Sequence, residues 1–378
     1  LSLCKKVNDE RMVFRKKNLM LILAILAKLG ETDKVRKAAY GAVLEIVKTL
    51  DHMAMFLHFY ELAGFGMKRP DGSVVGTGWG RSFKACMSVW FNSKDPSKLL
   101  YLFSKYKNRQ GWSWRDLLRL TKPKPYSEDH SRVYSYACGK EWIKSDHAGL
   151  NQQYDAIQIA NNCSDLVNLD SVLNTYGYKV AREHFPTTLW NIPGAWNRMF
   201  LTMPCTAALR NINKIDFENT RTGDACIEKI KNLLGTTESI LKAHLNPVNL
   251  LVAAKTYRSG SGCRSALTWK VNPVVAQIMD DSVEKSMKVC DWFSDKIHIA
   301  LDISGSMAAS FGDTPVSCVT MTAVIARLAL LKDENTPVHG FSNTYIDLKN
   351  KCASCYGYSN RDVNGYSNRD VNECNNKG

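Results

Sequence analysis

Hydrophobic positions recur with helical spacing through most of the chain. Asp33–Leu50 and Arg81–Phe91 each place apolar residues on one face of a helix. Later segments come in pairs joined by short turns, such as Thr237–Leu245 and Pro247–Tyr257. Paired helices of about 10–15 residues are typical of stacked helical repeats, although no repeated residue pattern accompanies them here. The pattern therefore predicts a mainly α domain of HEAT-like helical repeats over residues 1–290.

The pattern changes near Lys296. The apolar run Ile297–Leu301 predicts a strand, and Cys318–Leu331 predicts a helix. Pro337–Phe341 and Thr344–Leu348 predict two further short strands. Strand, loop, helix and strand open an α/β domain, but too few residues follow for a complete doubly wound sheet. We therefore expect only the N-terminal part of an α/β domain over residues 296–348.

The last stretch, residues 349–378, is polar and rich in Asn. Gly357–Asn364 recurs without a gap as Gly365–Asn372, which favours a low-complexity tail or a gene-model artefact over a functional repeat array. Cys352 and Cys355 form one C-x-x-C, but a zinc site needs four ligands and no second pair follows.

Two predicted helices meet at a corner in the first third of the chain. Asp95, followed by Pro, is a typical helix start, and Gly111 is placed to end that helix. Ser113 with Asp116 three residues later predicts a capping box for the second helix, which Pro123 stops. The sequence therefore predicts a helix-turn-helix corner here.

Positive charge is concentrated at this corner. The whole chain carries 50 Lys and Arg against 36 Asp and Glu, a net charge of +14. Such a balance indicates a polyanionic partner. A lone charge run is more often a solvated helix face, but the overall charge favours a phosphate-binding surface. The corner carries Lys105, Lys107, Arg109, Arg115, Arg119 and Lys122.

A second candidate site follows the first predicted strand of the α/β part. Asp302, Ser304 and Ser306 supply a carboxylate and two hydroxyls at the carboxyl end of that strand, and this set suits a hard cation such as Mg²⁺. The alternative is a Ser-rich capping turn. The chain has none of the common phosphate-loop, nucleophile-elbow or zinc-protease patterns, so we expect a binding protein rather than an enzyme.

Other features bear on location. The longest apolar run, Leu19–Ala27, is too short to span a bilayer and lacks a cleavage site, so it predicts a buried helix. The 12 cysteines are mostly scattered singly, as in reduced intracellular proteins, which favours the cytoplasm, with the nucleus as a second location. The first residue is Leu, which indicates a fragment or a processed chain.

Several segments, in order, resemble the TROVE domain of the 60 kDa Ro ribonucleoprotein family. They are Trp79-Gly80-Arg81, Lys105–Ser113, Asp116–Leu120, Lys122-Pro123, Met203–Asn211 and Tyr257-x-x-Gly260-x-Gly262. Asp302–Met307 resembles that family's von Willebrand A metal-binding motif. The likeness spans roughly residues 5–348.

The resemblance implies a ring of HEAT-like repeats closed by a von Willebrand A domain. It also implies that small noncoding Y RNAs bind the outer basic surface, and that single-stranded 3′ ends of misfolded small RNAs enter the ring in RNA quality control. The family's basic RNA-binding positions fall on Lys105 and Arg109. The candidate RNA-contacting set is completed by Lys107, Trp112, Arg115, Arg119, Lys122, Arg81 and Lys84.

The resemblance also implies an incomplete metal site. The family completes its site with a Thr and an Asp from later loops. This chain leaves the family pattern after about Leu348, so the resemblance implies a truncated A domain. It also implies a Mg²⁺ site that lacks those two ligands. The alternative function is a protein-interaction scaffold whose metal motif binds an acidic protein. An RNA-processing enzyme ranks third.

Overall fold

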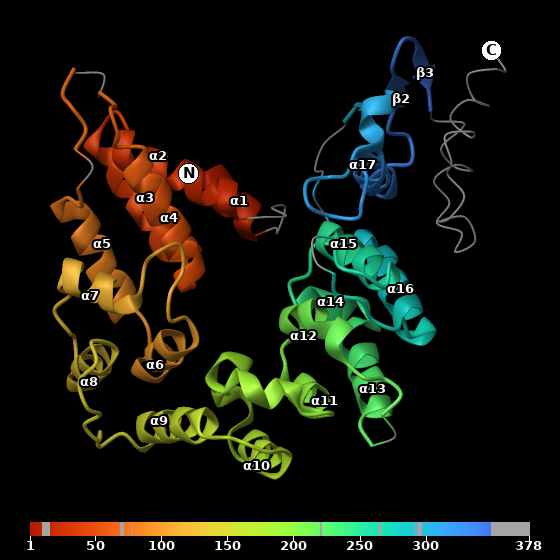
Figure 1. Cartoon of the computed structure of the whole chain (residues 1–378). Helices are drawn as coiled ribbons and strands as arrows, with labels where there is room; N and C mark the ends of the chain where they lie inside the picture. The colour runs from red at the N-terminus through yellow and green to blue at the C-terminus, as the bar shows by residue number, and fades with distance from the viewer. Residues whose placement is uncertain are drawn as a thin grey trace. The chain divides into compact units, whose positions relative to one another are not determined.

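The computed structural model describes residues 1–9, 16–68, 72–76, 78–219, 221–263, 266–290, 292 and 297–348. They form two compact units: the described residues of 1–246 with 272–278, and those of 247–271 with 279–348. Figure 1 shows the helices and strands in chain order. The first unit contains α1 Ser2–Asp9, α2 Lys17–Leu29, α3 Asp33–Ile46, α4 Leu50–Leu62, α5 Arg81–Asn92, α6 Pro96–Lys105, α7 Trp114–Thr121, α8 Glu128–Ala137, α9 Ala148–Asn161, α10 Leu166–Tyr176, α11 Ala195–Thr202, α12 Cys205–Asn211, α13 Gly223–Leu234 and α14 Thr237–Lys242.

The remaining elements lie towards the C-terminus or are single 3₁₀ turns. They are α15 Pro247–Arg258, α16 Pro273–Lys288, β1 Ile299–Asp302, α17 Cys318–Lys332, β2 Val338–Phe341 and β3 Tyr345–Asp347, with η1 Gly177–Lys179, η2 Arg182–His184, η3 Thr187–Asn191, η4 Ile212–Lys214 and η5 Gly305–Ala308. The described parts of the chain contain no helix long and apolar enough to cross a membrane.

Near the start of the first unit, α2 packs against α3 and α4 (Figure 1). The prediction of one helix over Asp33–Leu50 is wrong, because α3 ends at Ile46 and α4 begins at Leu50. Thr49 ends the break by accepting the backbone N–H of His52 at 3.4 Å, which caps the new helix. The break leaves the Val47 carbonyl without a helical partner, and the indole of Trp90 on α5 donates to it.

Aromatic side chains build the core of this unit behind the basic corner. Trp90 is fully buried, and its ring stacks on Trp114 of α7 with centroids 5.5 Å apart. Trp114 in turn packs against Phe103 of α6 at 4.9 Å and donates its indole N–H to the Leu102 carbonyl at 3.0 Å. The core therefore fixes α5, α6 and α7 against one another, and these helices carry the corner.

The second unit holds a small three-stranded sheet in the order β1-β2-β3. β1 and β2 run parallel, with Leu301 opposite Gly340, and β2 and β3 are antiparallel. Helix α17 covers this sheet through Ala326, which packs against Leu301 and Val338. Arg327 of α17 also pairs with Glu284 of α16 at 3.0 Å.

The predicted fold class is confirmed: a mainly helical chain ends in a small part of an α/β domain. The predicted strands lie within one or two residues of β1, β2 and β3. Closure of the helical repeats into a ring stays a prediction. The octapeptide repeat and the pair Cys352 and Cys355 lie outside the described residues.

Candidate nucleic-acid interface

Helix α6 and the turn after it carry the first part of the basic corner. Asp95 caps α6, because its carboxylate accepts the backbone N–H groups of Ser97 at 2.8 Å and Lys98 at 3.2 Å. The predicted start of the helix is confirmed. Its predicted end at Gly111 is wrong, since α6 ends at Lys105.

Gly111 instead shapes a tight turn. Arg109 and Trp112 exchange two backbone hydrogen bonds, at 2.9 and 2.8 Å, around Gln110 and Gly111. The φ angles of Gln110 and Gly111 are +53° and +80°, as a type I′ turn requires at both central positions. Gly111 therefore supplies a left-handed residue of this turn and does not end helix α6.

Helix α7 carries the second part of the corner. The predicted capping box is confirmed: Ser113 and Asp116 bond each other's backbone N–H, at 3.2 and 3.1 Å. Hydrogen bonds from Ser113 lower the pKa of the Asp116 carboxyl, and Arg115 and Arg119 lower it further. Arg115 and Arg119 are exposed, while the opposite face of α7 is buried.

Lys105 and Arg109 are not free surface side chains, contrary to the prediction. Both are half-buried and share one aromatic ring: the Lys105 ammonium lies 5.3 Å from the centre of the Tyr106 ring, and the Arg109 guanidinium carbon lies 5.4 Å from it. Lys105 also lies 5.5 Å from the Tyr101 ring centre. These cation–π contacts hold the two charges in place.

The cations of the corner form no ion pairs with the described acids, although Asp116 lies near Arg115 and Arg119. Among the described residues, no Asp or Glu forms an ion pair with a predicted RNA-contacting cation. Lys107, Lys122, Arg81 and Lys84 are exposed, and Lys122 ends α7 in a left-handed conformation. From here on, "basic corner" means Lys105, Lys107, Arg109, Arg115, Arg119 and Lys122; Arg81 and Lys84 lie nearby in sequence at the start of α5.

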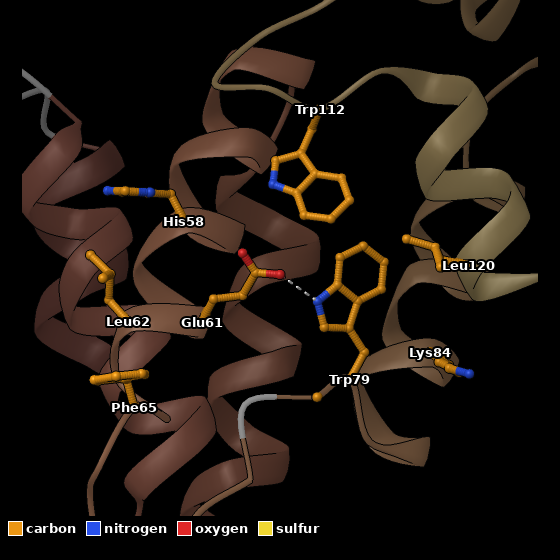
Figure 2. Close-up of a pocket in the computed structure, with 9 residues that line it drawn as sticks. His58, Glu61, Leu62, Phe65, Trp79, Lys84, Trp112 and Leu120 are labelled. Carbon is orange, nitrogen blue, oxygen red and sulfur yellow. Dashed lines mark hydrogen bonds between the residues drawn. The ribbon is translucent and has the colours of Figure 1, made fainter.

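Trp112, a member of the candidate RNA-contacting set, packs against another indole. Its ring is half-buried against Trp79, with centroids 5.0 Å apart and an angle of 45°. The two indoles line a pocket of about 600 Å³ together with Glu61, Lys84 and Leu120. Figure 2 shows Glu61 reaching from α4 towards Trp79, whose indole N–H donates to its carboxylate at 3.1 Å.

His184 supports the corner and was missed by sequence reasoning. Its Nδ1 accepts the backbone N–H of Ala181 at 3.0 Å, so the proton lies on Nε2, which faces the Ser104 hydroxyl at 3.0 Å. Burial lowers the pKa of His184 to about 4, with smaller contributions from Lys105 and Lys107 and an opposing one from Glu183. The neutral ring therefore anchors the end of α6. Eighty positions separate it from Ser104, so no local pattern could have indicated the contact.

A second basic-aromatic group lies later in the first unit and was also missed. The Lys214 ammonium lies 4.1 Å from the Trp196 ring centre, and Arg182 lies 6.0 Å from it. Trp190 packs against Trp196 at 5.0 Å. The three ring contacts come from η2, η3, α11 and η4, so only the folded chain brings them together.

The predicted metal ligands lie together at the end of β1. The Ser304 backbone N–H donates to Asp302 at 2.8 Å, and the Ser304 and Ser306 hydroxyl oxygens are 2.9 Å apart. Hydrogen bonds from Ser304 lower the pKa of the Asp302 carboxyl. No group of three or more His, Cys, Asp or Glu with metal-binding geometry occurs among the described residues. Any cation here would therefore be held by the Asp302 carboxylate and the two hydroxyls.

Comparison with known proteins bears on both the fold and the corner. Residues 16–166 match the TROVE domain family. Over this stretch the chain is similar to the TROVE domain. The matched residues span the whole basic corner and the pocket beside it, and the predicted resemblance is confirmed.

Two relatives are similar to most of this chain. The RNA-binding protein RO60 of Caenorhabditis elegans is 25% identical over 82% of this chain and 58% of its own length. The protein of the same name from Deinococcus radiodurans is 24% identical over 83% of this chain and 57% of its own length. The chain thus spans a little under three fifths of these relatives.

A solved structure shares the fold. The crystal structure of the Deinococcus radiodurans Ro (RSR) protein aligns with a TM-score of 0.67 at 22% identity, covering 92% of this chain and 67% of that one. The likeness therefore extends beyond the TROVE domain to the residues that follow it.

Proposed function

We propose that this chain is an RNA-binding ribonucleoprotein component whose basic corner binds small structured RNA. The observation that carries the proposal is a group of cations on two helices and a turn without ion-pair partners among the described acids. Phosphates of an RNA helix would supply the missing negative charge and release counterions. The TROVE match and the RNA-binding relatives support the same reading. The proposed role is binding, without catalysis.

The fixed positions of Lys105 and Arg109 strengthen this proposal. A flexible lysine or arginine loses side-chain entropy when it binds a phosphate. Both side chains already rest on Tyr106, and the end of α6 is anchored by His184. Part of that side-chain entropy is therefore already lost when the chain folds, before RNA binds. We call Lys105 and Arg109, held in this way, the prepared pair.

The finer proposal concerns the kind of RNA. We propose that Y RNA-like hairpins bind the basic corner and that single-stranded 3′ ends of misfolded RNAs bind elsewhere. Unpaired bases expose faces that stack on aromatic rings, and Trp196 with Lys214 and Arg182 offers such a ring beside two cations. A hairpin with a 3′ overhang should then bind more tightly than the same hairpin with a blunt end. Equal affinities would contradict this second mode.

The decisive experiment removes the prepared pair. Lys105→Ala with Arg109→Ala should weaken binding of a structured hairpin by about 2 kcal/mol or more, since each side chain makes a charge-assisted bond. The slope of log affinity against log salt should fall by about one to two units. Lys34→Ala with Lys37→Ala removes the same charge from exposed positions on α3 and should change affinity much less. Equal effects of the two double variants would contradict the assignment.

We also propose that Asp302, Ser304 and Ser306 can hold Mg²⁺. Ligands at about 2.1 Å from an octahedral Mg²⁺ lie about 3 Å apart when adjacent, and the two hydroxyl oxygens are 2.9 Å apart. The donor set is thus compatible with two neighbouring coordination positions. Waters would fill positions that the protein does not, and the bound cation would supply a positive charge for an acidic group of a partner.

A further inference from the structure

The pocket beside the basic corner has the size and walls of a small-molecule site. Its volume of about 600 Å³ falls within the usual range of ligand pockets. Two indoles form one wall, and a carboxylate and an ammonium provide polar groups (Figure 2). Trp112 belongs both to this wall and to the turn that holds Arg109. A nucleotide whose phosphate contacts the turn is therefore close to the pocket.

The indole wall permits stacking on one side only. Trp79 and Trp112 lie 5.0 Å apart and Trp79 also contacts Phe83 at 5.0 Å. A base sandwiched between two rings needs about 7 Å between them, because each stacked contact takes about 3.5 Å. A planar ligand must then lie on the pocket-facing side of the indoles. Base–aromatic stacking of this kind binds any base and gives little selectivity by itself.

Glu61 supplies the selectivity. One carboxylate oxygen accepts the Trp79 indole N–H at 3.1 Å, which holds the group in position, as Figure 2 shows. An ionised carboxylate accepts about four hydrogen bonds in all and donates none. It therefore favours a base edge that offers donors. Guanine has an N–H and an amino group side by side, which match the two oxygens as a fork, whereas uracil offers one N–H.

We propose that this pocket binds one unpaired guanine of the RNA, stacked on the Trp79–Trp112 wall and hydrogen-bonded to Glu61. Lys84 at the rim is an exposed cation available to the phosphate of the same nucleotide. The inference rests on the proposed RNA-binding function and adds a base preference that phosphate contacts lack.

Mononucleotides test the pocket without the rest of the RNA. GMP, IMP and UMP are titrated into the full chain and followed by indole fluorescence and by calorimetry. GMP should bind about tenfold more tightly than UMP or than IMP, which lacks the amino group. Glu61→Gln keeps an acceptor for Trp79 but places an NH₂ towards the base, so GMP should fall to the level of IMP. Trp112→Leu should abolish GMP binding, while Trp112→Phe, which keeps an aromatic ring, should retain most of it.

The outcomes separate this inference from the proposed function. No binding of any mononucleotide at about 10 mM, or equal binding of GMP and UMP, overturns the pocket assignment whatever the hairpin result. Loss of hairpin binding in the Lys105→Ala, Arg109→Ala variant with normal GMP binding supports both. A third outcome is that the pocket binds no nucleotide but binds an apolar dye, and that Trp112→Leu abolishes dye binding. The pocket would then be a protein-docking groove lined by the exposed side chains of Leu62, Phe65 and Leu120, and the inference would be wrong.

Discussion

The ring of His184 lies 3.0 Å from the hydroxyl of Ser104, and this contact joins the η2 turn to the end of α6. His184 is 2% exposed, and its other nitrogen is occupied by a backbone N–H. The imidazole can therefore satisfy both partners only in its neutral form. The positive charges of Lys105 and Lys107 nearby act in the same direction. A buried neutral histidine thus supports a surface that is strongly positive.

This arrangement makes the stability of the first unit depend on pH. Burial lowers the pKa of His184 to about 4, below the value of about 6.5 expected in the unfolded chain. The contribution is therefore present above pH 6.5 and is lost as pH falls towards 4. Between pH 7 and pH 5 the free energy of unfolding should drop by about 2 kcal/mol from this group. His184→Gln should remove that part of the pH dependence in chemical denaturation. His58→Gln, at an exposed position on α4, should leave it unchanged, and equal pH profiles for wild type and His184→Gln would contradict the account.

The break between α3 and α4 has an energetic consequence at Trp90. Its indole donates to the Val47 carbonyl at 2.7 Å inside the core. Trp90→Phe removes the donor and leaves both a buried carbonyl and a small cavity, so the free energy of unfolding should fall by about 2–4 kcal/mol. Urea denaturation measures this. Trp190→Phe alters a half-buried indole and should cost less than about 1 kcal/mol; similar losses for the two would show that the Val47 contact contributes little.

Local features of the corner could be predicted from sequence, and distant ones could not. Asp95 and Ser113 act on backbone N–H groups two or three residues away, so their caps are visible in a short window. The break after Ile46 leaves the Val47 carbonyl free, and the hydrogen bond that stabilises it comes from Trp90, more than forty positions later. Residues 46–49 taken alone favour a continuous helix.

In the candidate site, too, the features formed by neighbouring residues could be predicted from sequence and those formed by distant residues could not. The cations of the corner are close in sequence, and the charge run indicated them directly. The meeting of Trp79, Trp112 and Glu61 joins helix α4, the loop before α5 and the turn before α7, and no spacing in the sequence encodes it. The sequence therefore indicated Trp112 as a candidate but could not indicate what surrounds its ring.

A Gly→Ala substitution should change the free energy of unfolding in opposite directions in the I′ turn of the corner and in helix α3. Gly111 has φ +80° and no atom within 4 Å of the place that a Cβ would take, so Gly111→Ala should cost about 1 kcal/mol through backbone strain alone. Gly41, within α3, also has open space but an ordinary helical backbone, so Gly41→Ala should stabilise by about 0.5–1 kcal/mol. Gln110→Asn would create the favoured Asn-Gly pair and should stabilise the turn by a few tenths. Thermal denaturation distinguishes the signs, and a stabilising Gly111→Ala would rule out the left-handed turn.

The cation site at the end of β1 should bind Mg²⁺ weakly. Asp302, Ser304 and Ser306 provide at most one carboxylate and two hydroxyls, and neutral hydroxyls are weaker ligands for a hard cation than carboxylates. We expect a dissociation constant of about a millimolar, because much of the coordination shell would stay water. Asp302→Ala should abolish binding in calorimetry, since it removes the only charged ligand of the three. Ser304→Ala or Ser306→Ala should weaken binding, whereas Ser310→Ala changes an exposed hydroxyl four residues further on and should have no effect. Micromolar affinity, or binding that survives Asp302→Ala, would show that other groups of the chain complete the site.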